Sequence, residues 1–265
     1  MSDQIHVAGV SFDAVTFDGA VTELKRLLSS PEQSLLVTPN PEMVVAVQSD
    51  ADFKHILNNA ALSVPDGIGI LWASYFLSLP QRNVFTLISS LFQLALRRPA
   101  VFSQLPERVT GTDLFPEILK LAAKHDQPVF LLGAAEGVAA AAAEQLAILD
   151  LQVTTFAGSP RAEDEDEIIQ KIQNSNAAVL IVAYGAPAQE KWLARNLPRL
   201  PTVRLAAGLG GAFDFHAGRI SRAPAAFRQL GLEWLWRLIR QPQRAGRIWT
   251  ATGRFIGVIW QERYN

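Results

Sequence analysis

The stretch VLIVAYGAPAQEKW, residues 179–192, decides the fold class. Five apolar residues are followed by small, turn-forming residues and then by a helical pattern, which is typical of a buried strand that leads into a helix. Outward from this unit, the same alternation recurs in both directions along the chain. We expect strands at 34–38, 62–64, 129–132, 152–156, 179–183 and 203–206, and helices at 41–59, from about 68, at 137–149, 164–174 and 188–197. This order predicts an α/β fold with a Rossmann-like parallel sheet and helices on both faces.

The composition excludes several classes of protein. Of 265 residues, 49% are hydrophobic and 18% charged, which is too apolar for a disordered chain. The absence of cysteine excludes disulfides, thiolate catalysis and Cys-ligated metals. The net charge of −1 hides an asymmetry, because residues 219–265 hold nine Arg, no Lys and two acids. That segment carries +7 and the remainder −8, so we predict a catalytic domain at 1–218 and an Arg/Trp-rich helical appendage at 219–265.

No targeting or membrane-spanning segment is expected. The N-terminus lacks a basic region followed by an apolar run, so it does not resemble a secretory signal. The longest uncharged stretches, 67–81 and 83–96, are shorter than the roughly 18–20 residues that span a bilayer. We therefore expect a cytoplasmic protein. An apolar segment at 83–104 leaves two readings open: a buried core helix, or an amphipathic segment in a membrane interface.

The ends of the first two strands carry candidate site residues, because ligands of open α/β sheets bind outside the carboxyl ends of the strands. Asn40 before a proline is typical of a helix N-cap, and a helix start at this place also attracts anions. Thr38 and Asn40 are therefore candidate substrate donors, although Asn40 could be a cap alone. Asp66 and Gly67 follow the next strand. Asp66 is either a turn residue or a general base that deprotonates an attacking hydroxyl.

The later strand ends are rich in glycine. Gly133 follows one strand in a loop that suits a nucleotide but lacks the dinucleotide fingerprint. Gly185 follows the strand at 179–183, with Gln189 and Glu190 in the first turn of a helix, where Glu190 could instead only complement the helix dipole. Gly210 lies in a loop with three glycines in four positions, which indicates backbone close to a ligand or to another strand.

We predict no metal site. Asp164 and Asp166 match a D-x-D pattern, but they lie in a solvated acidic run, and the four histidines lack ligand spacing. The appendage has its own candidates, Arg222, Arg228, Arg237 and Arg240. Arg suits bidentate capture of phosphate, and Arg with Trp suits an anionic membrane surface. The acidic body argues against nucleic acid.

Seven motifs in order resemble the WecG/TagA/CpsF family of bacterial glycosyltransferases, over about residues 5–250. They are TPNPEMVV (38–45), ALSVPDGIGILWA (61–73), ERVTGTDLF (107–115), VFLLGAAEGVAAAAAEQL (129–146), AYGAPAQEKW (183–192), GLGGAFDFHAG (208–218) and RAP…GLEWLWRL…QPQR (222–244). The resemblance implies an inverting transfer of a sugar, N-acetylmannosamine or its uronic acid, from a UDP-sugar to a polyprenyl-diphosphate-linked acceptor. The transfer would be a step in the synthesis of a cell-surface polysaccharide or a teichoic-acid-type polymer. A protein of this family would act at the inner face of the bacterial plasma membrane as a peripheral protein, without a metal cofactor.

The resemblance also implies roles for residues. It makes Asp66 the candidate base, and Thr38, Asn40, Gln189 and Glu190 pocket residues. The four arginines of the appendage would close over the diphosphate and face lipid. Most relatives lack the 83–104 segment, which we interpret as a second membrane contact. A homo-oligomer is compatible with the resemblance.

Two other functions compete with a transferase. A Rossmann-type nucleotide-binding oxidoreductase is disfavoured by the missing dinucleotide fingerprint. A non-catalytic adaptor on the membrane periphery would bind anionic lipid through the appendage and would not need Asp66.

Overall fold

The computed structural model describes residues 3–145, 151–221, 223–224, 227, 233–240, 243 and 245–262. Its centre is a parallel sheet of six strands in the order β4-β3-β8-β7-β5-β6. The strands are β3 (Ser34–Val37), β4 (Leu62–Ser63), β5 (Val129–Gly133), β6 (Val153–Phe156), β7 (Val179–Ala183) and β8 (Leu205–Gly208). The predicted fold class is confirmed, and each predicted strand is present within one or two residues of its expected bounds.

The register explains why the central strands are apolar throughout. Ile181 of β7 pairs with Leu131 of β5 and Ala207 of β8, and all three belong to the core on one face of the sheet. Their neighbours Leu180 and Phe130 belong to the core on the other face. Both faces are covered by helices, so no position of these strands needs to be polar.

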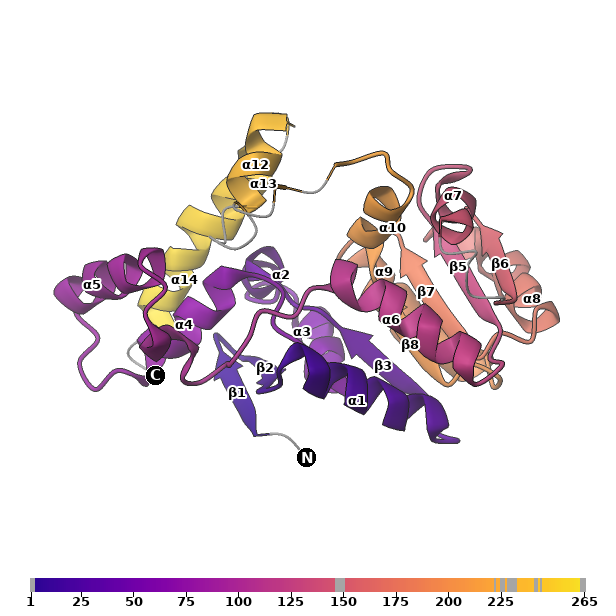
Figure 1. Cartoon of the computed structure of the whole chain (residues 1–265), viewed down its shortest axis with the longest axis horizontal. Coiled ribbons are helices and arrows are strands. Elements are labelled where there is room, and N and C mark those ends of the chain that lie inside the picture. Colours follow the sequence, from indigo (N-terminus) through magenta and orange to yellow (C-terminus); the bar gives the residue numbers. More distant parts are fainter. Residues whose placement is uncertain are drawn as a thin grey trace.

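Helices cover both faces of the sheet (Figure 1). The first face packs against α1 (Phe17–Ser29), α6 (Gly111–Lys124), α7 (Val138–Glu144) and α10 (Gly210–His216). On the second face, α8 (Glu165–Asn174) and α9 (Ala188–Asn196) cover β5, β7 and β8. Next to them, β3 lies under a separate core formed with α2 (Pro41–Ala46), α3 (Ala51–Asn58), α4 (Ile68–Ser78) and α14 (Phe255–Glu262). The remaining elements are α5 (Val84–Ala95), α12 (Glu233–Arg240), α13 (Ala245–Trp249), a π-helical turn η6 (Thr250–Arg254) and the 3-10 turns η1 (Pro99–Phe102), η3 (Ala162–Asp164) and η4 (Leu197–Arg199).

A β-hairpin that the sequence reasoning did not predict covers the edge of the sheet next to β4. It consists of β1 (Gln4–Val7) and β2 (Val10–Asp13), which pair antiparallel. The Ser63 amide donates to Asp13 Oδ2 over 2.8 Å, and Ser63 Oγ donates to the Ser11 carbonyl over 2.7 Å. The hairpin thus supplies partners to an edge strand that would otherwise expose its backbone groups.

One predicted helix was wrong in its extent. The range 41–59 forms two helices, α2 and α3, because Asp50 starts a new helix by accepting a hydrogen bond from the Phe53 amide over 3.0 Å. The helix predicted at 137–149 begins at Val138 and reaches Glu144, and residues 146–150 lie outside the described part of the chain.

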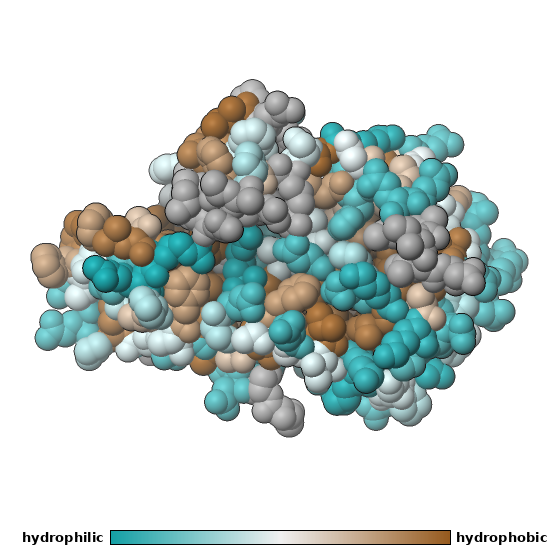
Figure 2. All heavy atoms as spheres, viewed as in Figure 1, coloured by the Kyte–Doolittle hydropathy of each residue, from teal (hydrophilic) through white to brown (hydrophobic). Residues whose placement is uncertain are grey.

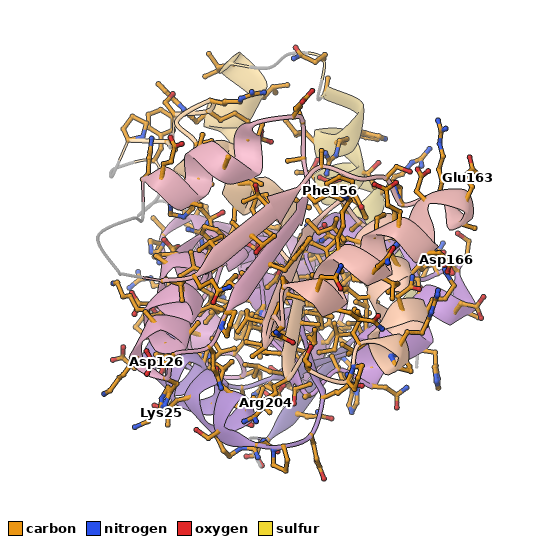
Figure 3. All side chains as sticks on the ribbon, turned by 90° about the vertical axis from the view of Figure 1, so that its right-hand side faces the viewer. Lys25, Asp126, Phe156, Glu163, Asp166 and Arg204 are labelled. Carbon is orange, nitrogen blue, oxygen red and sulfur yellow. The ribbon has the colours of Figure 1, made fainter. Side chains whose placement is uncertain are left out.

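Two neighbouring strands send their helices to opposite faces. After β3, α2 packs into the core of the second face, whereas after β8, α10 packs into the core of the first face. Such a divergence opens a crevice at the carboxyl edge of a parallel sheet. In Figure 3, Arg204 and Asp126, which precede β8 and β5, lie at the lower end of the sheet, and Phe156, the last residue of β6, lies at the upper end. The carboxyl edge therefore faces the C-terminal helices.

The apolar segment that follows α4 forms a helix with one packed face. Trp72 Nε1 donates to Ser90 Oγ and the Tyr75 hydroxyl donates to Gln93 Oε1, both over 2.9 Å, and these bonds fix α5 to α4. On α14, Phe255 and Ile259 enter the same core, so C-terminal and N-terminal residues share it. Among the described helices, none is long and apolar enough to cross a membrane. The division of the chain into 1–218 and 219–265 stays a prediction.

Candidate active site

A cavity of about 470 Å³ opens at the carboxyl edge of the sheet. Loops that follow four strands line it, together with the start of α6 and part of the C-terminal helices. From β3 come Thr38, Asn40, Pro41, Glu42 and Met43; from β4, Asp66 and Gly67; from β7, Ala183–Ala186 and Gln189; from β8, Gly208–Ala212 and Asp214; from the other segments, Arg108, Thr110–Thr112, Arg247, Ile248 and Ala251. The cavity thus lies where β3 and β8 diverge.

Among the described helices, five begin at this cavity and direct their N-terminal amides toward it. They are α2, α4, α6, α9 and α10, each of which has lining residues at its start. The first amides of a helix lack intrahelical acceptors and form the positive end of the helix dipole. At α4, α9 and α10 no side chain caps these amides. The geometry therefore suits an anionic ligand such as a diphosphate.

Asp66 stands at the edge of this cavity, directly after β4. Its amide donates to the Pro39 carbonyl over 3.1 Å, which ties the loop after β4 to the loop after β3. The Val109 amide donates to the Pro65 carbonyl over 3.1 Å, which places Arg108 in the same neighbourhood. Gly67 adopts a φ of +134°, so the turn that presents Asp66 requires a residue without a side chain. The structure thus brings the candidate base into one cavity with Arg108 and the loop after β3.

Thr38 and Asn40 both line the cavity, but their side chains also have structural tasks. Asn40 Oδ1 caps α2 by accepting from the Met43 amide over 3.1 Å. Only the amide nitrogen of its carboxamide is then left to donate to a ligand. Thr38 packs against Gly111, where a Cβ would lie 3.3 Å from Thr38 Oγ1 and 2.7 Å from the Leu209 side chain. The start of α6 therefore needs glycine in order to approach β3 and β8.

The Gln189 side chain connects the glycine loops that follow β7 and β8. Its Oε1 accepts from the Gly185 amide over 3.0 Å, and its Nε2 donates to Glu190 Oε1 over 2.8 Å. A Cβ at Gly210 would lie 2.9 Å from the Gln189 side chain. Sequence reasoning interpreted these glycines as signs of a nearby ligand or strand. In the structure, the close neighbour of Gly210 is a side chain of α9.

Glu190 lies behind Gln189 and is not among the residues that line the cavity. Its side chain is 1% exposed, and Oε2 has no hydrogen-bond partner among the described residues. Burial raises the pKa of Glu190 to about 7, against the opposing effect of the hydrogen bond from Gln189. The residue predicted as a pocket residue is thus a buried carboxyl beneath the site.

The two remaining glycine candidates differ in their surroundings. Gly185 has a φ of +79°, lines the cavity and has open space where a Cβ would point. Gly133 has a φ of +100°, but it does not line the cavity. A Cβ there would lie 2.9 Å from the backbone of Ala183. Close contact between β5 and β7 therefore accounts for this glycine.

Arg222 and Arg228 lie outside the described residues, and the side chains of Arg237 and Arg240 in α12 are not described, so their predicted roles stay predictions. Among the described residues, Arg108 and Arg247 line the cavity, and Arg247 Nε donates to Glu42 Oε2 over 2.8 Å. Arg108 follows no strand, so a search of strand ends misses it, although it lies in the quoted ERVTGTDLF motif.

The acidic residues of the D-x-D pattern have other partners. Asp166 forms an ion pair with Arg199 over 2.5 Å, and Asp164 accepts from the Ser159 hydroxyl. None of them lines the cavity. Within the described ranges, no group of three or more His, Asp or Glu side chains could hold a metal ion.

A methyl group at Gly208 tests the packing beneath the site. A Cβ there would lie 2.7 Å from Gln189 Nε2 and 2.8 Å from Glu190 Oε1, so Gly208→Ala must displace both buried side chains. We expect the free energy of unfolding to fall by about 1–3 kcal/mol. At Gly211 no atom lies within 4 Å of the added Cβ, so Gly211→Ala should leave stability unchanged in the same urea titration. Equal stability of both variants would contradict the packing argument.

Comparison with known proteins identifies the family. The sequence model of the glycosyl transferase WecG/TagA/CpsF family matches residues 5–102 and 93–265. The chain belongs to this family. As a member of the WecG/TagA/CpsF family it is a glycosyltransferase, and not the oxidoreductase or the adaptor of the competing hypotheses.

Curated relatives carry a more specific name. Proteins of Staphylococcus aureus strains MRSA252 and NCTC 8325 are each 29% identical to this chain over 249 residues. The match covers 92% of this chain and 88% of each relative. Both are named N-acetylglucosaminyldiphosphoundecaprenol N-acetyl-β-D-mannosaminyltransferase.

Proposed function

We propose that this enzyme transfers N-acetylmannosamine, or a closely related sugar, from a UDP-sugar to an N-acetylglucosamine linked to polyprenyl diphosphate. The observation that carries the proposal is the cavity in which Asp66 lies among Arg108, Arg247 and uncapped helix starts. The names of the Staphylococcus aureus relatives support the sugar and the acceptor. The enzyme would serve the synthesis of a cell-surface polymer at the inner face of the bacterial plasma membrane.

The proposed reaction is a direct displacement with inversion. Asp66 accepts the proton of the acceptor hydroxyl as the oxygen attacks the anomeric carbon of the donor sugar. The bond between that carbon and the diphosphate oxygen breaks, and UDP leaves with the electron pair. The helix starts and the guanidinium groups of Arg108 and Arg247 stabilise the negative charge that develops on the diphosphate. Since these cations belong to the protein, we propose that the reaction needs no bound metal.

An assay of UDP release tests this function. The enzyme is incubated with a panel of UDP-sugars and a short-chain polyprenyl-diphosphate-N-acetylglucosamine, with and without EDTA. We expect UDP release that depends on the acceptor and survives EDTA. The matched control acceptor is the same lipid diphosphate without its sugar, which lacks the attacking hydroxyl. Acceptor-independent release with every donor would contradict the proposal, and loss of turnover in EDTA would contradict its metal-free form.

Arg247 provides a test of charge stabilisation. Its guanidinium lines the cavity, so Arg247→Ala should lower kcat/KM by about 10-fold, and Arg247→Lys should recover part of the loss because it keeps the charge. Arg254 lies in the following π-helical turn, is exposed and does not line the cavity, so Arg254→Ala is the matched control. Equal rates of Arg247→Ala and wild type in the UDP-release assay would rule out the role of this arginine.

A further inference from the structure

The helix α5 exposes an apolar stripe on the side that faces away from the core. Val84, Ile88, Phe92 and Leu96 follow one another at intervals of four residues, and Phe85 stands beside the first of them. These five side chains are 52–80% exposed. Side chains four residues apart lie on one face of a helix, so together they form a continuous ridge, which we call the α5 stripe.

The opposite side of the helix is firmly attached to the protein. Leu87, Leu91 and Leu94 pack against the core around α4, and the hydrogen bonds from Trp72 and Tyr75 add two fixed points. A capping box formed by Asn83 and Thr86 defines the start of the helix. The contacts of α5 with the core thus come from this packed side and not from the α5 stripe. Figure 2 shows the corresponding apolar side chains at the left end of the molecule, over α5.

The chain segment that contains the stripe carries charges of one sign. Between Asp66 and Glu107 the chain has no acidic residue, whereas it has Arg82, Arg97 and Arg98. Arg97 and Arg98 are exposed directly after the helix, at the end of the stripe. An apolar ridge with a cationic end matches the interface of an anionic bilayer, where hydrocarbon lies beneath negatively charged headgroups.

A second exposed apolar surface lies on the C-terminal helices, close to the cavity. Trp249 is exposed, while Arg247, Ile248 and Ala251 of the same helical turns line the cavity. Both α5 and α14, which continues these helices, contact α4. The helix α4 therefore packs against both the helix that carries the stripe and the helices at the mouth of the site.

We propose that the α5 stripe inserts into the interfacial layer of an anionic phospholipid bilayer and holds the cavity at the membrane surface. Its benefit for catalysis rests on the proposed function, because a lipid-linked acceptor stays in the bilayer. The stripe lies in the plane of the membrane, since α5 has 12 residues and a spanning helix needs about 20. Its arginines contact the lipid phosphates.

Vesicle flotation of the full-length protein tests the proposal. Vesicles of pure phosphatidylcholine and of phosphatidylcholine mixed with phosphatidylglycerol are compared. The combined variant Phe85→Ser, Ile88→Ser and Phe92→Ser should reduce binding to the mixed vesicles at least about 10-fold, because it removes the inserted surface. Phe85→Trp is the conservative control and should bind as wild type does, since indole favours the interface.

Two double variants test how the arginines contribute to vesicle binding. Arg97→Gln with Arg98→Gln should weaken binding to the mixed vesicles and leave binding to pure phosphatidylcholine unchanged. Lys25→Gln with Arg204→Gln removes two charges from exposed positions at the lower end of the molecule in Figure 3, and should have no effect on either kind of vesicle. Thermal unfolding of every variant should match wild type, because all these side chains are exposed.

Two results would overturn the proposal. One is wild-type protein that does not float with the mixed vesicles, and the other is a serine variant that floats as wild type does. If the serine substitutions also dissociate a wild-type dimer, the second result would assign the stripe to a second copy of the chain. UDP release with the short-chain acceptor is measured in parallel. The serine variant should retain UDP release. Absence of UDP release in wild type would refute the proposed function and would leave the result of the vesicle experiment unaffected.

Discussion

Asp66→Asn should lower kcat for acceptor-dependent UDP release by at least about 100-fold, with little change in stability. The amide keeps the shape of the carboxylate but cannot accept the proton of the attacking hydroxyl, and general base catalysis typically contributes 10²- to 10⁴-fold. The backbone bond between the Asp66 amide and the Pro39 carbonyl is independent of the side chain, so the loop should stay in place. The measurement is initial rate with the short-chain acceptor at saturating donor.

Asp126→Asn is the matched control for this prediction. Asp126 is exposed, precedes β5 and lies at the opposite edge of the sheet, so its substitution should leave kcat unchanged. A rate for Asp66→Asn within a few-fold of wild type would assign the base to another group. An equal loss in the control would indicate a general effect of charge.

Glu190→Gln should make the protein more stable above neutral pH and flatten its dependence on pH. Burial raises the pKa of Glu190 from 4.5 to about 7 in the folded protein. Between these values the folded state binds more protons than the unfolded state, so the free energy of unfolding falls as pH rises. The difference of about 2.5 pH units corresponds to about 3 kcal/mol, which the ionised carboxyl costs at pH 8 and glutamine does not.

Urea unfolding at several pH values between 5 and 8 measures this effect. Glu190→Gln keeps an oxygen that can accept from Gln189 Nε2, so its stability should match wild type near pH 5 and exceed it near pH 8. Glu136→Gln, at an exposed position, is the control and should follow the wild-type curve. Parallel curves for Glu190→Gln and wild type would show that Glu190 titrates at its ordinary pKa.

The sequence by itself determined the sheet and the edge at which the site lies. Apolar runs such as 129–132 can only be buried on both faces, and a parallel sheet is the structure that buries them. The residues that end these runs meet at the carboxyl edge, which is why Thr38, Asn40, Asp66, Gly185, Gln189 and Gly210 could be predicted to lie together and do line one cavity. Local patterns were sufficient because each of these signals depends on a few adjacent residues.

Only the tertiary structure decided which groups surround the candidate base. Arg108 and Arg247 are 139 positions apart in the chain and reach the same cavity through the packing of loops and C-terminal helices. The burial of Glu190 and the exposed stripe of α5 likewise depend on which side of a helix meets the core. A sequence pattern gives the two sides of a helix, but it does not give their neighbours, because burial and long-range contacts arise from the packing of distant segments.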